Sequence, residues 1–166
     1  SNLGFYRCCE ANGVKPIATK VGDRYVLEEM REHGYKIGGE QSGHIIFLDH
    51  ATTGDGQLSA VKLLSLCREK GQKLSRVASV MERYPQVLIN VRADAQQKAR
   101  YAADQALADY ISGANDSLGR DGRVLVRVSG TEPLLRVMVE GQDFDEINRC
   151  AVEIAERIKA SIAAEE

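Results

Sequence analysis

The chain has 166 residues, with 22 Lys and Arg against 24 Asp and Glu, which gives a formal net charge of −2 at pH 7. This balance excludes the broad basic surface that drives nonspecific nucleic-acid binding, and 5% aromatic residues with no Trp argue against base stacking. No apolar run approaches the ~20 residues that a membrane span needs. We therefore expect neither a nucleic-acid partner nor a membrane partner.

The cysteines and histidines also narrow the function. There is no Cys-x-x-Cys pair, and the first residues lack the basic and apolar stretches of a secretory signal. The thiols are therefore expected to be buried and reduced in a cytoplasmic protein. His33, His44 and His50 have no metal-like spacing, so no metal ligands are expected in this chain. The four cysteines are Cys8, Cys9, Cys67 and Cys150.

The first half of the chain alternates helical and extended segments, which is typical of an α/β layer. The longest expected helix follows Thr52-Thr53-Gly54-Asp55 and ends at Lys70. Apolar side chains cover more than one stripe of this helix, which predicts that it is buried on two sides. The expected elements are helices over 3–12, 23–33, 55–70 and 74–81, extended segments over 15–20 and 45–48, and a glycine-rich loop over 38–43.

Tyr84-Pro85 is the expected domain boundary, because the residue before a proline resists the helical conformation. The domains would then be residues 1–84 and 85–166. In the second domain, alternating apolar residues predict strands, and Asp143 is expected to cap the final helix. The expected elements form a βαββα unit of the α+β class: strands over 87–91, 123–128 and 134–140, a helix over 96–111, a loop over 112–122 and a helix from 143 onward.

Residues 127–136, with the sequence RVSGTEPLLR, join two of the predicted strands. Backbone N–H groups around Gly130 and the hydroxyls of Ser129 and Thr131 can surround an anion. Arg127 at the base of the loop can bind a phosphate with several N–H donors. The other interpretation is an ordinary hairpin loop whose Ser and Thr bond their own backbone. The spacing alone leaves both interpretations open.

A second polar segment, residues 38–44 (GGEQSGH), lies between two apolar stretches. Its glycines let the backbone approach a ligand closely, and it carries a carboxylate (Glu40), an amide (Gln41), a hydroxyl (Ser42) and an imidazole (His44). This set suits sugar hydroxyls, and His44 could also move a proton near neutral pH. The segment lacks the GxGxxG spacing of a dinucleotide loop. The alternative is a polar strand connection in which a backbone group satisfies His44.

Taken together, these two segments resemble signatures of the bacterial phosphoglucosamine mutases, a family of the α-D-phosphohexomutase superfamily. Lys20–Val26 and Thr52–Gly56 also resemble that family, so the resemblance covers the chain in order. Gln41 favours glucosamine over the substrates of the sister phosphomannomutases and phosphoglucomutases. The implied fold is α/β plus α+β: part of a three-layer α/β sugar-binding domain (1–84), then a βαββα phosphate-binding domain with an antiparallel sheet (85–166).

The resemblance implies an isomerase that converts glucosamine 6-phosphate into glucosamine 1-phosphate, through a bisphosphate and a phosphoserine enzyme with bound Mg²⁺. This is a cytoplasmic step toward UDP-N-acetylglucosamine and the cell wall. Glu40 and Ser42 would hold sugar hydroxyls, and His44 and Lys20 would lie near the transferring phosphoryl group. The residues that the resemblance assigns to the phosphate are Arg127, Ser129, Gly130 and Thr131. Strand alternation adds Arg136 as a candidate, because it also lies off the apolar face, but Arg127 is nearer to the loop.

No segment resembles the phosphoserine motif or the Asp-rich metal loop of the family. The expectation is therefore a C-terminal part of the enzyme, without Mg²⁺ ligands and without turnover by itself. An incomplete first domain would leave apolar surface through which the chain self-associates. Two other interpretations remain: a fragment of a phosphomannomutase or phosphoglucomutase, and a free-standing anion-binding module that is not an enzyme.

Overall fold

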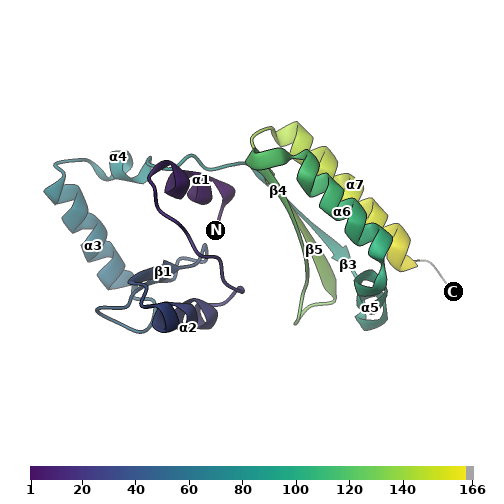
Figure 1. The fold of residues 1–166 in the computed structure, drawn as a ribbon, viewed down its shortest axis with the longest axis horizontal. Helices are drawn as coiled ribbons and strands as arrows, with labels where there is room; N and C mark the ends of the chain where they lie inside the picture. The colour runs from purple at the N-terminus through teal and green to yellow at the C-terminus, as the bar shows by residue number, and fades with distance from the viewer. Residues whose placement is uncertain (164–166) are drawn as a thin grey trace. The chain divides into compact units, whose positions relative to one another are not determined.

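The computed structural model describes residues 1–163. The chain separates into two units, Ser1–Glu82 and Arg83–Glu166, and each contains helices and strands (Figure 1). Tyr84 is bonded within the second unit, because its hydroxyl donates to Asp121 Oδ1 (3.1 Å) and accepts from Gln142 Nε2 (3.1 Å). The separation therefore falls just before the Tyr84-Pro85 pair. The mixture of helices with small antiparallel sheets confirms the predicted fold class.

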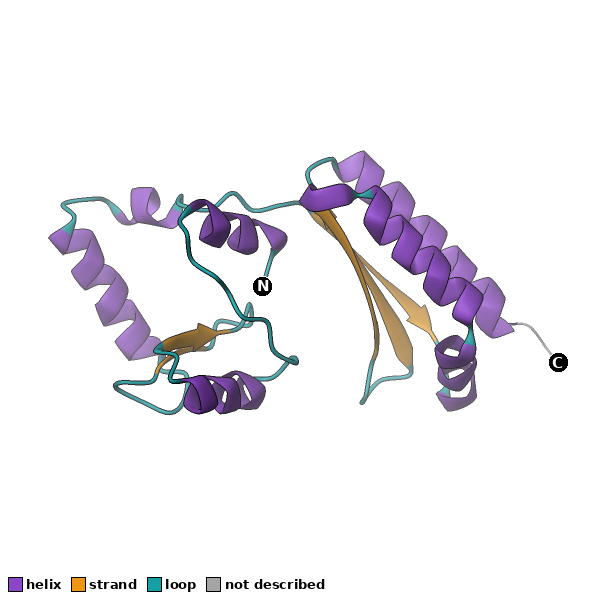
Figure 2. Ribbon diagram, viewed as in Figure 1, coloured by secondary structure: helices purple, strands orange, loops and turns teal. Residues whose placement is uncertain are grey.

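The first unit, all of which the structure describes, combines helices with a two-stranded antiparallel hairpin (Figure 2). Gly39 lies opposite Ile45 in this hairpin, so the predicted glycine-rich loop is shorter than expected and its first glycines belong to a strand. The connection that remains, residues 40–44, is called the β1–β2 turn below. The elements are α1 (Leu3–Ala11), α2 (Asp23–His33), β1 (Ile37–Gly39), β2 (Ile45–Phe47), α3 (Gly56–Glu69) and α4 (Leu74–Ala78).

The hairpin packs directly against α2. A Cβ atom at Gly38 would lie 2.4 Å from the sulfur of Met30 and 2.6 Å from Cγ1 of Val26, so only glycine fits at this point of the strand. Met30 and Ile46 are among the buried apolar residues of the unit. This contact fixes the strand that leads into the β1–β2 turn.

The prediction that α3 is buried on two sides is wrong. The helix is capped as expected, with Asp55 Oδ1 accepting from the Leu58 N–H (2.9 Å), but none of its residues is buried. Val61 is 61% exposed and Leu64 60%. Among the described elements only the short helix α4 packs against α3 to any extent, and the hairpin does not. The apolar stripes of α3 are therefore left uncovered.

The second unit contains a three-stranded antiparallel sheet with the order β3-β5-β4, and α6 and α7 lie on one side of it (Figure 1). Residues 129–133, called the β4–β5 loop below, connect the last two strands. The elements are β3 (Gln86–Arg92), α5 (Ala95–Ala103), α6 (Gln105–Ser117), a 3₁₀ turn (Gly119–Asp121), β4 (Gly122–Val128), β5 (Leu134–Gly141) and α7 (Phe144–Ala163).

One helix was expected between β3 and β4, and the structure has two. Asp104 divides them, because its Oδ1 accepts from the Leu107 N–H (2.9 Å) and caps α6, while its Oδ2 accepts from Ser161 Oγ (2.6 Å). The second helix then continues to Ser117 through most of the predicted loop. The chain turns only at Gly119, which has a φ of 63°.

The core of the second unit lies between the sheet and α7. Leu135, Val137 and Val139 of β5 are fully buried, as their alternation predicts, and Ile147, Ile154 and Ile158 of α7 meet them. Burying each such side chain contributes roughly 1.5–3 kcal/mol. Asp143 Oδ1 accepts from the N–H groups of Asp145 and Glu146 in the first turn of α7, which confirms the predicted cap of this helix.

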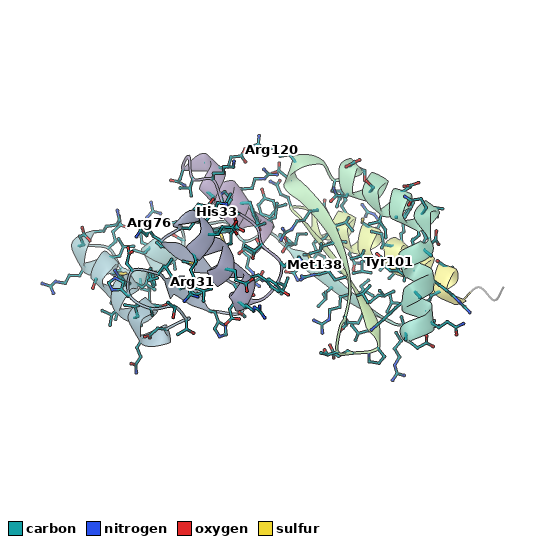
Figure 3. The ribbon with its side chains drawn as sticks, turned by 60° about the horizontal axis from the view of Figure 1, so that its bottom comes forward. Arg31, His33, Arg76, Tyr101, Arg120 and Met138 are labelled. Atoms are coloured by element: carbon teal, nitrogen blue, oxygen red, sulfur yellow. The ribbon has the colours of Figure 1, made fainter. Side chains whose placement is uncertain are left out.

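The other face of this sheet lies away from the helices. Figure 3 shows Tyr101 on the helical side and Met138 of β5 extending from the opposite side. Strand alternation therefore places Arg127 and Arg136 on the side of Met138. This orientation leaves both arginines outside the core.

Two sequence expectations concern the whole chain. No helix among residues 1–163 combines the length and the apolar content that a membrane span needs. The four cysteines are free, as predicted, but they are partly rather than fully buried.

Candidate functional site

The β4–β5 loop uses some of its backbone donors internally. The Ser129 N–H donates to Leu134 O (3.0 Å), the Glu132 N–H to Ser129 Oγ (3.1 Å) and the Leu134 N–H to Glu132 O (2.9 Å). In the part of the chain that the structure describes, no acceptor is recorded for the N–H groups of Gly130 and Thr131. Two consecutive amides at an exposed loop tip can therefore serve an anion.

The two hydroxyls of the loop differ. Ser129 Oγ accepts a backbone N–H within the loop, which is the bond that the ordinary hairpin interpretation predicts. The Thr131 hydroxyl has no recorded partner among residues 1–163, and its side chain is exposed. One hydroxyl thus shapes the loop, whereas the other is available to a ligand.

Three arginines lie near the β4–β5 loop on the sheet face that α7 does not cover, which is called the open face below. Arg127 and Arg136 are direct cross-strand partners, and Arg136 forms an ion pair with Glu132. Arg127 is exposed, and no hydrogen bond or ion pair is recorded for it within the described residues. Arg92 ends β3 on the same face, because its neighbour Val91 is in the core. Like charges placed directly opposite each other are destabilising, so an anion at this point would relieve the repulsion.

Lys98 of α5 lies beneath the loop. Its Nζ donates to Ser129 O and to Glu132 O, both at 2.7 Å. The sequence reasoning missed Lys98 and Arg92. The alternation of β3 could have placed Arg92 on the open face, but no local signal connects Lys98 with a loop 31 residues further along the chain.

In the first unit, the β1–β2 turn contains a chain of polar contacts. Ser42 Oγ donates to Glu40 Oε2 (3.1 Å) and lies 3.2 Å from His44 Nδ1. Because the single hydroxyl proton goes to Glu40, Nδ1 is assigned as the donor to Oγ, which leaves Nε2 as the basic nitrogen. The imidazole is thus held by a side chain and not by the backbone group of the alternative interpretation.

The same carboxylate reaches the segment that carries Lys20. Glu40 Oε1 accepts from the Gly22 N–H at 2.8 Å, which connects the two segments through one side chain. Lys20 Nζ lies 5.8 Å from the centroid of the Tyr25 ring, a cation–π contact that leaves its N–H donors exposed.

Close packing also fixes His44. A Cβ atom at Gly54 would lie 3.1 Å from its Cδ2 atom, so the missing side chain leaves space for the ring. The structure therefore links Glu40, Ser42 and His44 within one turn, and the Gly22 N–H connects this turn to the segment that carries Lys20. The candidates of the second unit lie in the β4–β5 loop and in the two strands that it joins.

The described residues do not fit a Mg²⁺ site. The one group of His, Cys, Asp and Glu side chains among them with ligand atoms close enough to share an ion is Glu29, Glu32 and His33 on α2 (His33 is labelled in Figure 3). Mg²⁺ prefers six oxygen ligands, whereas this group includes an imidazole nitrogen that lies 3.2 Å from a Glu29 carboxylate oxygen.

Comparison with known families identifies both units. The family model described as phosphoglucomutase/phosphomannomutase, alpha/beta/alpha domain III, matches residues 1–84. The model of the phosphoglucomutase/phosphomannomutase C-terminal domain matches residues 88–157. The chain therefore belongs to the phosphoglucomutase/phosphomannomutase family, which confirms the resemblance drawn from its motifs.

Relatives with sequence similarity carry a more specific name. The phosphoglucosamine mutase of Thermoanaerobacter sp. (strain X514) is 52% identical over 162 residues, which cover 98% of this chain and 36% of the relative. The phosphoglucosamine mutase of Clostridium acetobutylicum is 50% identical over 159 residues, covering 96% of this chain and 36% of the relative. The chain thus spans about a third of the length of the curated relatives that it matches.

Solved structures show the same fold at low sequence identity. N-acetylphosphoglucosamine mutase of Aspergillus fumigatus matches with a TM-score of 0.80 and 18% identity, over 97% of this chain and 37% of that one. A phosphoglucomutase/phosphomannomutase family protein from Burkholderia thailandensis matches with a TM-score of 0.73 and 21% identity, over 98% of this chain and 36% of that one.

Proposed function

We propose that this chain is the sugar- and phosphate-recognition part of a phosphoglucosamine mutase, which interconverts glucosamine 6-phosphate and glucosamine 1-phosphate. Support comes from the relatives of that name, at 52% identity over almost the whole chain. The observation that carries the proposal is the β4–β5 loop, in which the adjacent amides of Gly130 and Thr131 have no recorded acceptor among residues 1–163 and follow three and four positions after the exposed Arg127. Gln41 in the β1–β2 turn favours glucosamine among the hexose phosphates.

In this proposal the second domain (85–166) holds the phosphate that does not react. The N–H groups of Gly130 and Thr131 donate to phosphate oxygens, and Arg127 adds its N–H donors. Hydrogen bonds to a charged group contribute about 1.5–3 kcal/mol each. Arg136 contributes less, because Glu132 already pairs with it. Phosphoryl transfer depends on positioning and charge stabilisation, which a fixed phosphate supplies.

The first domain (1–84) holds the sugar. Glu40 and Ser42 accept and donate hydrogen bonds at the sugar hydroxyls, and the contact between Gly22 and Glu40 keeps the carboxylate in place. His44 and Lys20 lie near the transferring phosphoryl group. Lys20 stabilises its negative charge, and the Nε2 atom of His44 exchanges a proton with the sugar hydroxyl.

The reaction needs groups that this sequence does not contain. In the proposed route a phosphoserine passes its phosphoryl group to the substrate, and the resulting bisphosphate returns the other phosphoryl group to the serine. We propose that the serine and an Asp-rich Mg²⁺ loop precede this chain in the enzyme, so that the chain alone shows no turnover. We also propose that the enzyme is cytoplasmic, because its four thiols are free. Its product would there be used to make UDP-N-acetylglucosamine and the cell wall.

The coding sequence upstream of this chain and a turnover assay test the proposal together. The upstream sequence should encode a phosphoserine motif and an Asp-rich loop. The complete enzyme should have its highest kcat/KM with glucosamine 6-phosphate among the glucosamine, glucose and mannose phosphates, while the 166-residue chain converts none. Preference for glucose or mannose would identify a sister mutase. Unrelated upstream sequence would favour the anion-binding module, and turnover by the chain alone would contradict its assigned role.

A further inference from the structure

We infer that Lys98 is the positioning residue that directs the Gly130 N–H toward the anion in the β4–β5 loop. This inference rests on the proposed phosphate binding. It concerns how the donor is oriented, because Lys98 contacts two carbonyl groups of the loop and extends from a different element, α5.

The contacts of Lys98 fix the two ends of the loop. Its ammonium group donates to Ser129 O and to Glu132 O at 2.7 Å each, and the side chain is partly buried beneath the loop. Two of its three N–H donors are thereby used. The ammonium group therefore holds loop carbonyls and is not presented as the main anion donor.

The effect on Gly130 follows from peptide geometry. The Ser129 carbonyl and the Gly130 N–H belong to the same peptide bond, and no cis peptide is found in the described chain. In a trans peptide these two groups point in opposite directions. Because Lys98 holds the Ser129 oxygen toward α5, the Gly130 N–H points away from α5 and out of the loop.

Without Lys98, little would hold this peptide plane. Gly130 is exposed, and a Cβ atom built at this position would meet nothing within 4 Å. Glycine also permits a wide range of backbone dihedral angles. The peptide could then rotate, and the amide would lose its fixed direction. The Thr131 N–H depends less on Lys98, because its peptide carbonyl belongs to Gly130, which Lys98 does not contact.

The start of α5 gives Lys98 a firm base. Asp94 Oδ1 accepts from the Gln97 N–H (2.8 Å), and Gln97 Oε1 accepts from the Asp94 N–H (3.0 Å), which forms a capping box. The preceding Ala93 N–H donates to Pro133 O at 3.0 Å. The helix that carries Lys98 is thus bonded to the same loop by its backbone.

The test uses three variants of the ¹⁵N-labelled chain, titrated with inorganic phosphate at constant ionic strength. Lys98→Met keeps the stem but removes the donors, and Lys98→Arg keeps the positive charge and has enough N–H donors for both carbonyl groups. The control is Lys159→Met, which removes an exposed lysine paired with Glu156 on α7. Lys98→Met should weaken phosphate binding about tenfold, which corresponds to ~1.4 kcal/mol. Lys98→Arg should recover most of this loss, and the control should bind like the wild type.

A second readout separates positioning from general stability. In Lys98→Met, the shift of the Gly130 amide on phosphate addition should fall more than that of Thr131, and the heteronuclear NOE of Gly130 should fall without ligand. Equal losses at both amides, or wild-type affinity in Lys98→Met, would overturn the inference. If the wild type does not respond to phosphate, the proposed function fails, and the NOE of Gly130 still decides the role of Lys98. Should Lys98→Met not fold, Lys98→Gln replaces it with the same expectations.

Discussion

Arg127→Met tests the proposed phosphate contact most sharply, because the change affects the ligand and leaves the described fold intact. Arg127 has no recorded partner among residues 1–163, so no internal bond is lost. A phosphate held by one part of the enzyme is expected to bind with a Kd near 1 mM, or about −4 kcal/mol. Losing contacts worth roughly 1.5–3 kcal/mol weakens this by about ten- to a hundredfold, out of the measurable range.

The stability of the second unit should not fall in Arg127→Met, in contrast to the affinity for phosphate. Arg127 lies directly opposite Arg136, and like charges at such positions are destabilising by a few tenths of a kcal/mol. Glu132 offsets part of this repulsion through its ion pair with Arg136. A relief of about 0.3 kcal/mol would raise the Tm of a domain of this size by roughly 1–2 °C. Arg127→Met should therefore lose binding with an unchanged or slightly raised Tm.

The assay is an NMR titration with glucosamine 1-phosphate, followed at the Gly130 and Thr131 amides, together with a thermal melt. The matched control is Arg149→Met, because Arg149 on α7 is also exposed and has no recorded partner among the described residues. A Kd within twofold of the wild type in Arg127→Met would refute the assigned contact. An equal loss in both variants would show that overall charge, and not local geometry, attracts the phosphate.

Three further changes test the fold and its surfaces. Ile154→Ala removes a fully buried side chain and should lower the free energy of unfolding by about 2–5 kcal/mol in urea, so a loss below ~1 kcal/mol would contradict the described core. Hydrogen bonds lower the pKa of the Asp104 carboxyl: the one from Ser161 Oγ has the largest effect, and the one from the Leu107 N–H has a smaller effect. Its stabilising contribution is therefore complete above the usual Asp pKa of ~3.9 and is lost as the pH falls through the lowered value. Asp104→Asn keeps a capping oxygen and should flatten the acid-side decline of Tm, whereas an unchanged slope would argue against this linkage. Leu64→Glu on the exposed face of α3 should reduce concentration-dependent self-association in sedimentation, and an unaltered distribution would remove α3 from that interface.

The sequence predicted those elements whose determinants are local. The strands of the second unit follow from apolar alternation, because α7 packs on one face of the sheet, and Asp143 caps α7 through neighbours two and three residues away. The division into α5 and α6 at Asp104 was not predicted, since one hydrogen bond of this residue comes from Ser161 near the C-terminal end of α7. Asn115 belongs to the segment expected to be a loop, yet it lies within α6 and its Oδ1 accepts from the Val124 N–H (2.9 Å) of β4.

In the candidate site, too, the sequence predicted the residues that lie close together along the chain and missed those that only the fold brings together. Ser129, Gly130 and Thr131 are consecutive, so their motif could be found by reading the chain, and strand alternation placed Arg127 at the base of the loop. Lys98 contacts this loop from a helix that follows a different strand, and only the folded arrangement brings it there. The burial predicted for α3 failed for a related reason, because apolar periodicity shows that a helix can pack on two sides but not which surface covers it.

The most direct measurement of the central claim is a ¹⁵N titration of the wild-type chain with glucosamine 1-phosphate, inorganic phosphate and glucosamine, each at the same ionic strength. If the β4–β5 loop binds phosphate, both phosphate ligands should shift the amides of Gly130 and Thr131, whereas glucosamine alone should leave these two signals in place. Amides that stay unshifted with either phosphate ligand, or that respond equally to glucosamine, would contradict phosphate recognition by the β4–β5 loop.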